Sequence, residues 1–174
     1  MKQSQANKKK YLIWLTGIAG SGKTTIARKI ISRVRKRLGP TILINGDDMR
    51  EIFSLKSYGI KGRKKVAIAY TKLCKLIIDQ GVNIIFATVS MYDDVRKLNR
   101  KNFRKNYIEI FIDADIKNIL KNKKKFLYFT NKKSIVGKGV KAEYPKNPDI
   151  IIKNDFSKNL NTISKEILQK IFKK

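Results

Sequence analysis

The chain has 174 residues and a formal net charge of +28, from 41 lysines and arginines against 13 acidic residues. This length suits one domain with its own core, and one cysteine without any histidine excludes an internal disulfide and a Cys–His zinc site. No apolar run approaches the ~18 residues of a membrane span, and residues 1–10 lack the apolar core of a signal peptide, so we expect a cytoplasmic protein without a membrane partner.

Short apolar runs alternate with helical patterns along the chain. Buried strands are predicted at residues 11–16, 41–44, 83–89, 107–112 and 150–152, and helices at residues 22–37, 63–80, 92–103 and 157–172. Cys74 falls on the apolar face of the second of these helices and is predicted to lie in the core. The pattern indicates an α/β fold in one domain over residues 11–174, after a basic disordered tail at residues 1–10. Its centre is a five-stranded parallel sheet with helices on both faces.

The large positive charge makes nucleic-acid binding a candidate function. However, the lysines are spread through helices, loops and both termini, and no aromatic-rich basic strand resembles the stacking surface of an RNA-binding module. We therefore expect no specific nucleic-acid partner and a surface that favours polyanionic substrates such as nucleotides.

One stretch departs from the alternation of strands and helices. Residues 121–148, between the fourth and fifth strands, are rich in Lys, Gly and Asn and carry only scattered apolar residues. Irregular segments of this length in a compact domain are usually functional, and a lid over bound nucleotide is the natural interpretation. A disordered basic insertion is the alternative.

The first strand runs into a phosphate-binding motif, which places the fold among the P-loop NTPases. The motif fits the pattern G-x-x-x-x-G-K-T, and the predicted ATP-binding residues are Gly17, Ala19, Gly20, Ser21, Gly22, Lys23, Thr24 and Thr25. Backbone N–H groups of such a loop surround phosphates, and the following helix adds its N-terminal dipole. Lys23 would bridge the β- and γ-phosphates and Thr24 would hold Mg²⁺, so ATP and Mg²⁺ are the predicted cofactors. An ordinary glycine turn is the alternative.

Acidic residues follow the second strand, at Asp47 and Asp48, with Arg50 close behind. The carboxyl ends of parallel strands meet at one edge of a sheet, so we expect these side chains beside the phosphate-binding loop. A carboxylate there can accept a hydroxyl proton or help to place Mg²⁺, and Arg50 can hold an acceptor phosphate bidentately. Asp47 is therefore a candidate base and Mg²⁺ ligand, with a helix N-cap as the alternative role.

Several motifs together resemble the adenylylsulfate kinase family. They are Trp14-Leu15-Thr16-Gly17, Gly20-Ser21-Gly22-Lys23-Thr24-Thr25-Ile26-Ala27, Gly46-Asp47 with Arg50, Tyr107-Ile108-Glu109-Ile110-Phe111-Ile112-Asp113 and Asn147-Pro148-Asp149. The resemblance extends over most of the chain. It implies a kinase that uses ATP to phosphorylate the 3′-hydroxyl of a nucleotide, with a mobile lid and a homodimeric assembly.

The resemblance also implies roles for single residues. Asp47 would be the catalytic base, Lys23 and Ser90 would act beside it, and the acceptor would be bound by Arg50, Tyr58, Arg63, Ser90, Lys133, Ile135 and Gly137. Tyr58 matches an aromatic residue that stacks on the acceptor base, and Lys133 and Gly137 belong to the lid. For Ser90, a cap at the end of the third strand is the alternative.

The chain departs from the family pattern on the acceptor side. Val66, Ala67, Ile68 and Ala69 stand where the family has an Asn-Ile-Arg-Arg run that helps to bind the charged tail of the acceptor. Each charge-assisted hydrogen bond lost there is worth roughly 1.5–3 kcal/mol. In addition, Ile135 replaces a lid phenylalanine, Asn45 replaces an aspartate, and Asn122 stands where an arginine is common.

These departures indicate an acceptor that is still a nucleoside 5′-phosphate derivative but has a different base and tail. The chain looks most like the branch of the family that phosphorylates cytidine diphosphoramidate in the making of capsule phosphoramidate. An adenylylsulfate kinase with altered specificity contacts, a basic nucleic-acid-binding ATPase, and a kinase of another small acceptor such as a sugar stay open as alternatives.

Overall fold

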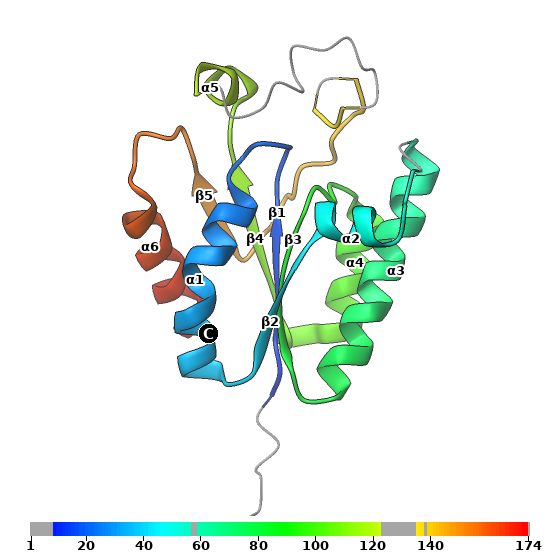
Figure 1. Ribbon diagram of the computed structural model, residues 1–174, viewed down its shortest axis with the longest axis vertical. Coiled ribbons are helices and arrows are strands. Elements are labelled where there is room, and N and C mark those ends of the chain that lie inside the picture. Colours follow the sequence, from blue (N-terminus) through cyan, green and yellow to red (C-terminus); the bar gives the residue numbers. More distant parts are fainter. Residues whose placement is uncertain (1–8, 57–58, 123–134, 138, 174) are drawn as a thin grey trace, which may run out of the picture.

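The computed structural model describes residues 9–56, 59–122, 135–137 and 139–173. Its centre is one sheet of five parallel strands in the order β2-β3-β1-β4-β5 (Figure 1). The strands are β1 (Leu12–Thr16), β2 (Thr41–Asn45), β3 (Asn83–Thr88), β4 (Tyr107–Asp113) and β5 (Ile150–Lys153). Because β1 lies in the middle, the chain winds outward in both directions from it, and the predicted doubly wound sheet is confirmed.

Helices cover both faces of the sheet, which Figure 1 shows nearly edge on. Helices α1 and α6 lie on one face, and α3 and α4 lie on the other. The helical segments are α1 (Lys23–Leu38), α2 (Gly46–Ile52), α3 (Ile60–Asp79), α4 (Asp93–Phe103), the 3-10 turn η1 (Arg104–Asn106), α5 (Ile116–Lys121) and α6 (Leu160–Phe172). The sequence predicted the four long helices and missed α2 and α5, because six or seven residues are too few for apolar spacing to show.

Two apolar layers hold the helices to the sheet. In the layer under α3 and α4, the Trp14 and Phe86 rings stack with their centroids 4.8 Å apart, and the Tyr70 ring packs on Phe86 at 5.1 Å. Cys74 belongs to the same layer and is fully buried, which raises the pKa of its thiol. The predicted core position of Cys74 is confirmed.

Strand β5 stands at one edge of the sheet. Ile150 and Ile152 are 2% exposed, whereas Ile151 between them is 48% exposed. The sequence predicted a strand covered on both faces, and for β5 this is wrong, because the outer face of an edge strand meets solvent.

The strands all point their carboxyl ends toward the same end of the molecule, at the top of Figure 1. The phosphate-binding loop follows β1 there, Asn45 ends β2, Thr88 ends β3 and Asn154 follows β5. Residues far apart in the sequence are thereby brought to one edge of the sheet, as the rule for open α/β sheets requires.

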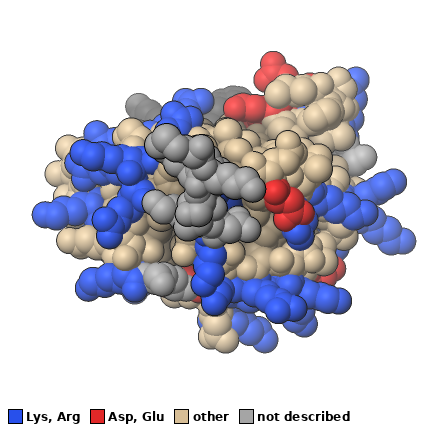
Figure 2. All heavy atoms as spheres, turned by 90° about the horizontal axis from the view of Figure 1, so that it is seen from below, with Lys and Arg blue, Asp and Glu red and all other residues tan. Residues whose placement is uncertain are grey.

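Basic side chains are spread over the surface rather than gathered in one groove, at least on the face in Figure 2, which is seen from the end opposite the phosphate-binding loop. This agrees with the even spread of lysines along the sequence. Within the part of the chain that the structure describes, no helix is long and apolar enough to cross a bilayer.

Two described residues of the predicted lid, Ile135 and Val136, pack against the domain. Lys121, where the predicted lid begins, is the last residue of α5. Ile135 and Val136 are 4% and 3% exposed, and the backbone N–H groups of Gly139 and Val140 both donate to the carbonyl of Ile135. Ile135 packs in a small apolar cluster with Ile18 of the phosphate-binding loop, so this end of the predicted lid is joined to the site.

Candidate active site

The phosphate-binding loop turns sharply between β1 and α1. Gly17 has a φ of 152°, and a Cβ there would lie 2.5 Å from the carbonyl oxygen of Ile112, so only glycine fits. Lys23 is 7% exposed, and its Nζ donates to the carbonyl of Ile18 at 2.8 Å and to Ser21 Oγ at 3.4 Å. The ammonium group is therefore held within the loop, where phosphate oxygens would meet it.

A residue that the sequence did not predict connects this loop to the end of the edge strand β5. Asn154 is 6% exposed, and its Nδ2 donates to the carbonyl of Ser21 at 2.9 Å. Its own backbone N–H donates to the carbonyl of Asp113 at 2.7 Å. The position of Asn154 directly after the last strand is the sequence signal that could have identified it.

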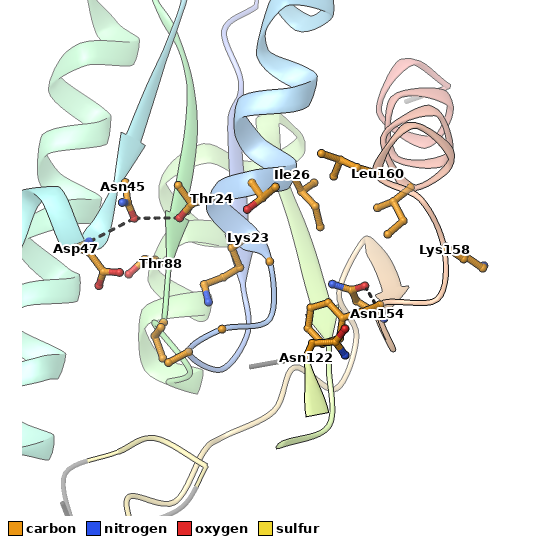
Figure 3. A pocket seen from close by; sticks show the side chains of 18 residues that line it. Lys23, Thr24, Ile26, Asn45, Asp47, Thr88, Asn122, Asn154, Lys158 and Leu160 are labelled. Atoms are coloured by element: carbon orange, nitrogen blue, oxygen red, sulfur yellow. Dashed lines mark hydrogen bonds between the residues drawn. The ribbon is translucent and has the colours of Figure 1, made fainter. Parts of the chain in front are cut away.

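Asn45 joins the loop to helix α2. Its Oδ1 accepts from the Thr24 hydroxyl at 3.3 Å and from the backbone N–H of Asp47 at 3.4 Å (Figure 3). Its Nδ2 donates to Asp48 Oδ1 at 2.9 Å. Asn45 is thus the N-cap of α2, and the alternative role of Asp47 as that cap is wrong. The Asp47 side chain instead points toward Thr88 in Figure 3.

A first cavity of about 490 Å³ runs along the phosphate-binding loop (Figure 3). We call it the ATP cavity. Its lining includes six of the predicted ATP-binding residues, namely Ala19, Gly20, Gly22, Lys23, Thr24 and Thr25. Its other side is formed after α5, after β5 and by α6, through Asn122, Asn154, Phe156, Lys158, Leu160 and Ile163. Gly17 and Ser21 shape the loop from behind and line neither cavity.

A second cavity of about 700 Å³ lies between α2, α3 and the link from β3 to α4. We call it the acceptor cavity. Four residues predicted to bind the acceptor line it, namely Arg50, Arg63, Ser90 and Ile135. The structure therefore brings together side chains from four separate segments that the sequence assigned to one ligand.

The two cavities meet. Ala19, Asp47, Thr88 and Val89 line both of them. Thr88, which the sequence analysis missed, stands so close to the start of α2 that a Cβ on Gly46 would lie 2.7 Å from its Oγ1. A group bound at the end of one cavity next to Asp47 would therefore face a group bound in the other.

The wall formed by α3 is apolar at Val66, where the family pattern has an asparagine. Of the four departures, Val66 and Ala67 line the acceptor cavity, Ile68 packs into the layer under α3, and Ala69 is exposed. The positive charges of this cavity come from outside that run, from Arg50, Lys56 and Arg63.

Ser90 lies at the junction of β3 and α4. It is 3% exposed, and its Oγ has no hydrogen-bond partner among the described residues. The alternative role of a strand-end cap is therefore wrong within that part of the chain, since a cap requires a bond to a backbone N–H. Its carbonyl accepts from Thr16 Oγ1 at 3.1 Å, which fixes the backbone beside the acceptor cavity.

Three predicted site residues remain. Tyr58 and Lys133 lie outside the described residues. Gly137 has a φ of 90°, and a Cβ there would lie 3.1 Å from Cγ2 of Ile18, so this position packs closely on the phosphate-binding loop without lining either cavity.

The Asn-Pro-Asp motif before β5 is structural. Asp149 Oδ2 accepts from the backbone N–H of Glu109 at 2.8 Å, and Arg100 contacts the carboxylates of both residues. Glu109 is 2% exposed, and burial raises the pKa of its carboxyl against the opposing influence of Arg96 and Arg100. The motif therefore fixes strand β4 and the start of β5, away from both cavities.

The doubly wound sheet, the phosphate-binding loop and the adjoining acceptor cavity define the class of protein: an α/β kinase of the P-loop type. Comparison with known proteins identifies the family. The family model described as adenylylsulphate kinase matches residues 9–153. The chain belongs to the adenylylsulfate kinase family and is an ATP-dependent phosphotransferase that acts on a hydroxyl group.

Individual relatives agree with this assignment. Cytidine diphosphoramidate kinase of Campylobacter jejuni is 35% identical over 165 residues, which cover 92% of this chain and 96% of that protein. Adenylyl-sulfate kinase of Clostridium kluyveri is 29% identical, with 94% and 82% covered. The structure of the Mycobacterium tuberculosis APS kinase with AMPPNP and APS has a TM-score of 0.81 at 20% identity and covers 94% of this chain and 98% of that one, which confirms the fold.

Proposed function

We propose that this kinase transfers the γ-phosphoryl group of ATP to the 3′-hydroxyl of cytidine diphosphoramidate. The observation that carries the proposal of direct transfer is the junction of the two cavities at Asp47 and Thr88. Two substrates bound in adjoining cavities can meet in line without water between them, which is what phosphoryl transfer requires.

Asp47 is proposed as the base that accepts the proton of the acceptor hydroxyl. It lines both cavities and stands at the N-terminus of α2, where Asn45 fixes the backbone but leaves its carboxylate unused as a cap. A general base must lie within hydrogen-bond reach of the proton it removes, and a residue common to both cavities meets this requirement. Ser90 is proposed to hold the acceptor beside it.

Lys23 and the loop backbone are proposed to bind the phosphates of ATP. The buried ammonium group is already held inside the loop by Ile18 and Ser21, so little reorganisation is needed when phosphate oxygens replace these partners. The absence of room for a Cβ at Gly17 fits a loop shaped for close backbone approach.

The residues also fit the proposed Mg²⁺. Thr24 and Asp47 line the ATP cavity, and Asn45 holds the Thr24 hydroxyl and the Asp47 backbone with one oxygen. Such hard oxygen ligands suit Mg²⁺, which proteins usually bind through one or two side chains together with substrate phosphates. When bound, the ion supplies positive charge to the transferring phosphoryl group.

The choice of cytidine diphosphoramidate rests on two supports. One is the Campylobacter jejuni relative, whose name states that acceptor and which matches almost the full length of both chains. The other is the apolar Val66 on the cavity wall, which stands where the family pattern has the polar side chain of an asparagine. Adenylylsulfate is the second candidate acceptor, favoured by the family match over residues 9–153. The homodimer and the lid stay predictions.

The test is an assay with ATP, Mg²⁺ and cytidine diphosphoramidate, read by mass spectrometry for the added phosphoryl group and by ³¹P NMR for its position. We expect a new phosphate on the 3′-oxygen. The matched control is the 3′-deoxy acceptor, which binds in the same cavity but offers no 3′-hydroxyl. Phosphorylation of the 3′-deoxy compound, or no product from either acceptor, would contradict the proposal.

A further inference from the structure

Two residues that line the acceptor cavity carry a buried hydroxyl group without a hydrogen-bond partner among the described residues. These groups are Ser90 Oγ and the hydroxyl of Tyr92, and both residues are 3% exposed. Buried polar groups in folded proteins are nearly always paired. An unpaired hydroxyl is destabilising in the free protein, and a ligand that pairs with it removes that penalty on binding.

A second tyrosine on the same cavity provides an internal comparison. The hydroxyl of Tyr70 donates to the carbonyl of Gly46 at 3.4 Å, so its hydrogen bond serves the fold. Tyr92 has no such bond within the described chain. The two tyrosines share a core layer and a cavity, and they differ in whether the protein itself uses the hydroxyl.

The ring of Tyr92 is firmly placed. It packs in the layer with Trp14 and Val95, and Lys64 Nζ lies 5.5 Å from its centroid. Tyr92 is also the N-cap residue of α4, and the next backbone N–H, that of Asp93, donates to Glu143 Oε2 at 2.6 Å. The hydroxyl therefore occupies a fixed position, so little conformational entropy is lost when a ligand binds to it.

The charges around Tyr92 favour an anion. Burial is the largest influence and raises the pKa of the phenol, so the hydroxyl keeps its proton at neutral pH and can donate it. Arg63, Lys64 and Arg50 act in the opposite direction and Glu143 adds to the rise. Because Lys64 is paired with Asp94 at 2.9 Å and lies 3.7 Å from Glu143, the excess of positive charge near the ring comes from Arg63 and Arg50. A neutral donor among cations is suited to a phosphate oxygen.

Resting on the proposed function, we infer that Tyr92 is a specificity-determining residue whose hydroxyl donates a hydrogen bond to an oxygen of the phosphate chain at the 5′ end of the acceptor. The inference places that chain on the Arg63 side of the cavity, beside the β3–α4 link. The acceptor cavity would then contact the phosphate chain of the acceptor without using the apolar residues 66–69 of α3.

The test compares Y92F with the wild-type enzyme. Hydrogen bonds to charged groups are the strong ones, so we expect Y92F to raise the KM for the acceptor about tenfold or more. The KM for ATP should stay constant. The thermal midpoint of the ligand-free protein should stay the same or rise. The Y70F variant is the contrasting control: it removes a hydrogen bond made by the fold and should lower the midpoint. The Y144F variant, at a 51% exposed tyrosine outside both cavities, should change neither the KM for the acceptor nor the thermal midpoint.

A lowered midpoint in Y92F with both KM values altered would assign Tyr92 a structural role and overturn the inference, as would an unchanged KM for the acceptor. Calorimetric titration separates this outcome from failure of the proposed function. With AMPPNP filling the ATP cavity, cytidine 5′-diphosphate is titrated into wild type and Y92F. Weaker binding to Y92F supports the inference even where no turnover is found, and equal binding overturns it even where turnover is found.

Discussion

The ATP cavity and the acceptor cavity are built in different ways. One side of the ATP cavity is a continuous loop, and the polar groups at that loop are already paired: Lys23 with Ile18 and Ser21, and Asn154 with Ser21. The acceptor cavity is formed by side chains from α2, α3, the β3–α4 link and the described end of the predicted lid. Two buried hydroxyls there have no partner among the described residues.

We expect this difference to separate what members of the family share from what each member varies. A loop made of backbone groups binds phosphates whatever the rest of the substrate is, because every residue carries the same N–H. A cavity lined by side chains changes its ligand whenever those side chains change. We therefore expect substitutions around the ATP cavity to affect catalysis or folding, and substitutions around the acceptor cavity to affect substrate choice.

The largest effect is expected at the junction of the cavities. D47N removes the proposed base, and general base catalysis typically contributes about 10²–10⁴-fold, so kcat should fall by about that factor. ATP binding, measured by calorimetry in the absence of Mg²⁺, should be unchanged, because the loop contacts are intact. The control is D48N, since Asp48 bonds to Asn45 and lines neither cavity. Near-normal turnover in D47N would remove Asp47 from the proposed mechanism.

Two glycine substitutions test how closely the phosphate-binding loop packs against β4. In G17A the new Cβ meets the carbonyl of Ile112 at 2.5 Å, so strain and overpacking should lower the free energy of unfolding by about 2–5 kcal/mol. G39A is matched in having a positive φ, of 89°, but has no atom within 4 Å of the new Cβ, and about 1–2 kcal/mol is expected. Denaturant unfolding measures both, and equal losses would mean that close packing at Gly17 is unimportant.

Arg63 tests the acceptor cavity alone. R63A removes a charge that lines this cavity and not the other, so the KM for the acceptor should rise by roughly 10–100-fold, which corresponds to about 1.5–3 kcal/mol. The KM for ATP should stay constant. Steady-state kinetics with each substrate varied in turn gives both values. A parallel rise in both would break the distinction between the cavities.

Asn45 tests the connection between the loop and α2. N45A removes the cap of α2 and the partner of the Thr24 hydroxyl, and loss of such a cap costs about 1 kcal/mol of stability. N45S keeps a side-chain oxygen that can cap α2 and loses the bond to Asp48 without adding a charge, so its stability should fall less. Thermal unfolding ranks the variants. An N45A protein as stable as wild type would mean that this cap is dispensable.

The smallest effect is expected at Cys74. Burial raises the pKa of its thiol, so the reactive thiolate is scarce as well as inaccessible, and the folded protein should react with a thiol reagent only on unfolding. Labelling in buffer and in denaturant measures the difference. Rapid labelling of the native protein would show that the layer under α3 opens readily.

The same contrast explains what the sequence could predict. The loop was predicted because its residues are consecutive, and Asp47 and Arg50 because they follow a strand. Asn154 also follows a strand, but its bond to the Ser21 carbonyl spans 133 positions, and no local pattern links the two residues. The hydroxyl of Tyr92 becomes unpaired only through packing between α3 and α4, since its sequence neighbours do not determine its burial. Residues that depend on tertiary contacts were therefore the ones missed.

The central claim is that the altered acceptor cavity selects a cytidine nucleotide. The most direct measurement is a competition in which equal concentrations of cytidine diphosphoramidate and adenylylsulfate share limiting ATP, because the product ratio then equals the ratio of kcat/KM values. We predict that the 3′-phosphorylated cytidine product exceeds the adenosine product by at least about tenfold, a preference of about 1.4 kcal/mol. Equal products, or an excess of 3′-phosphoadenylylsulfate, would contradict the account.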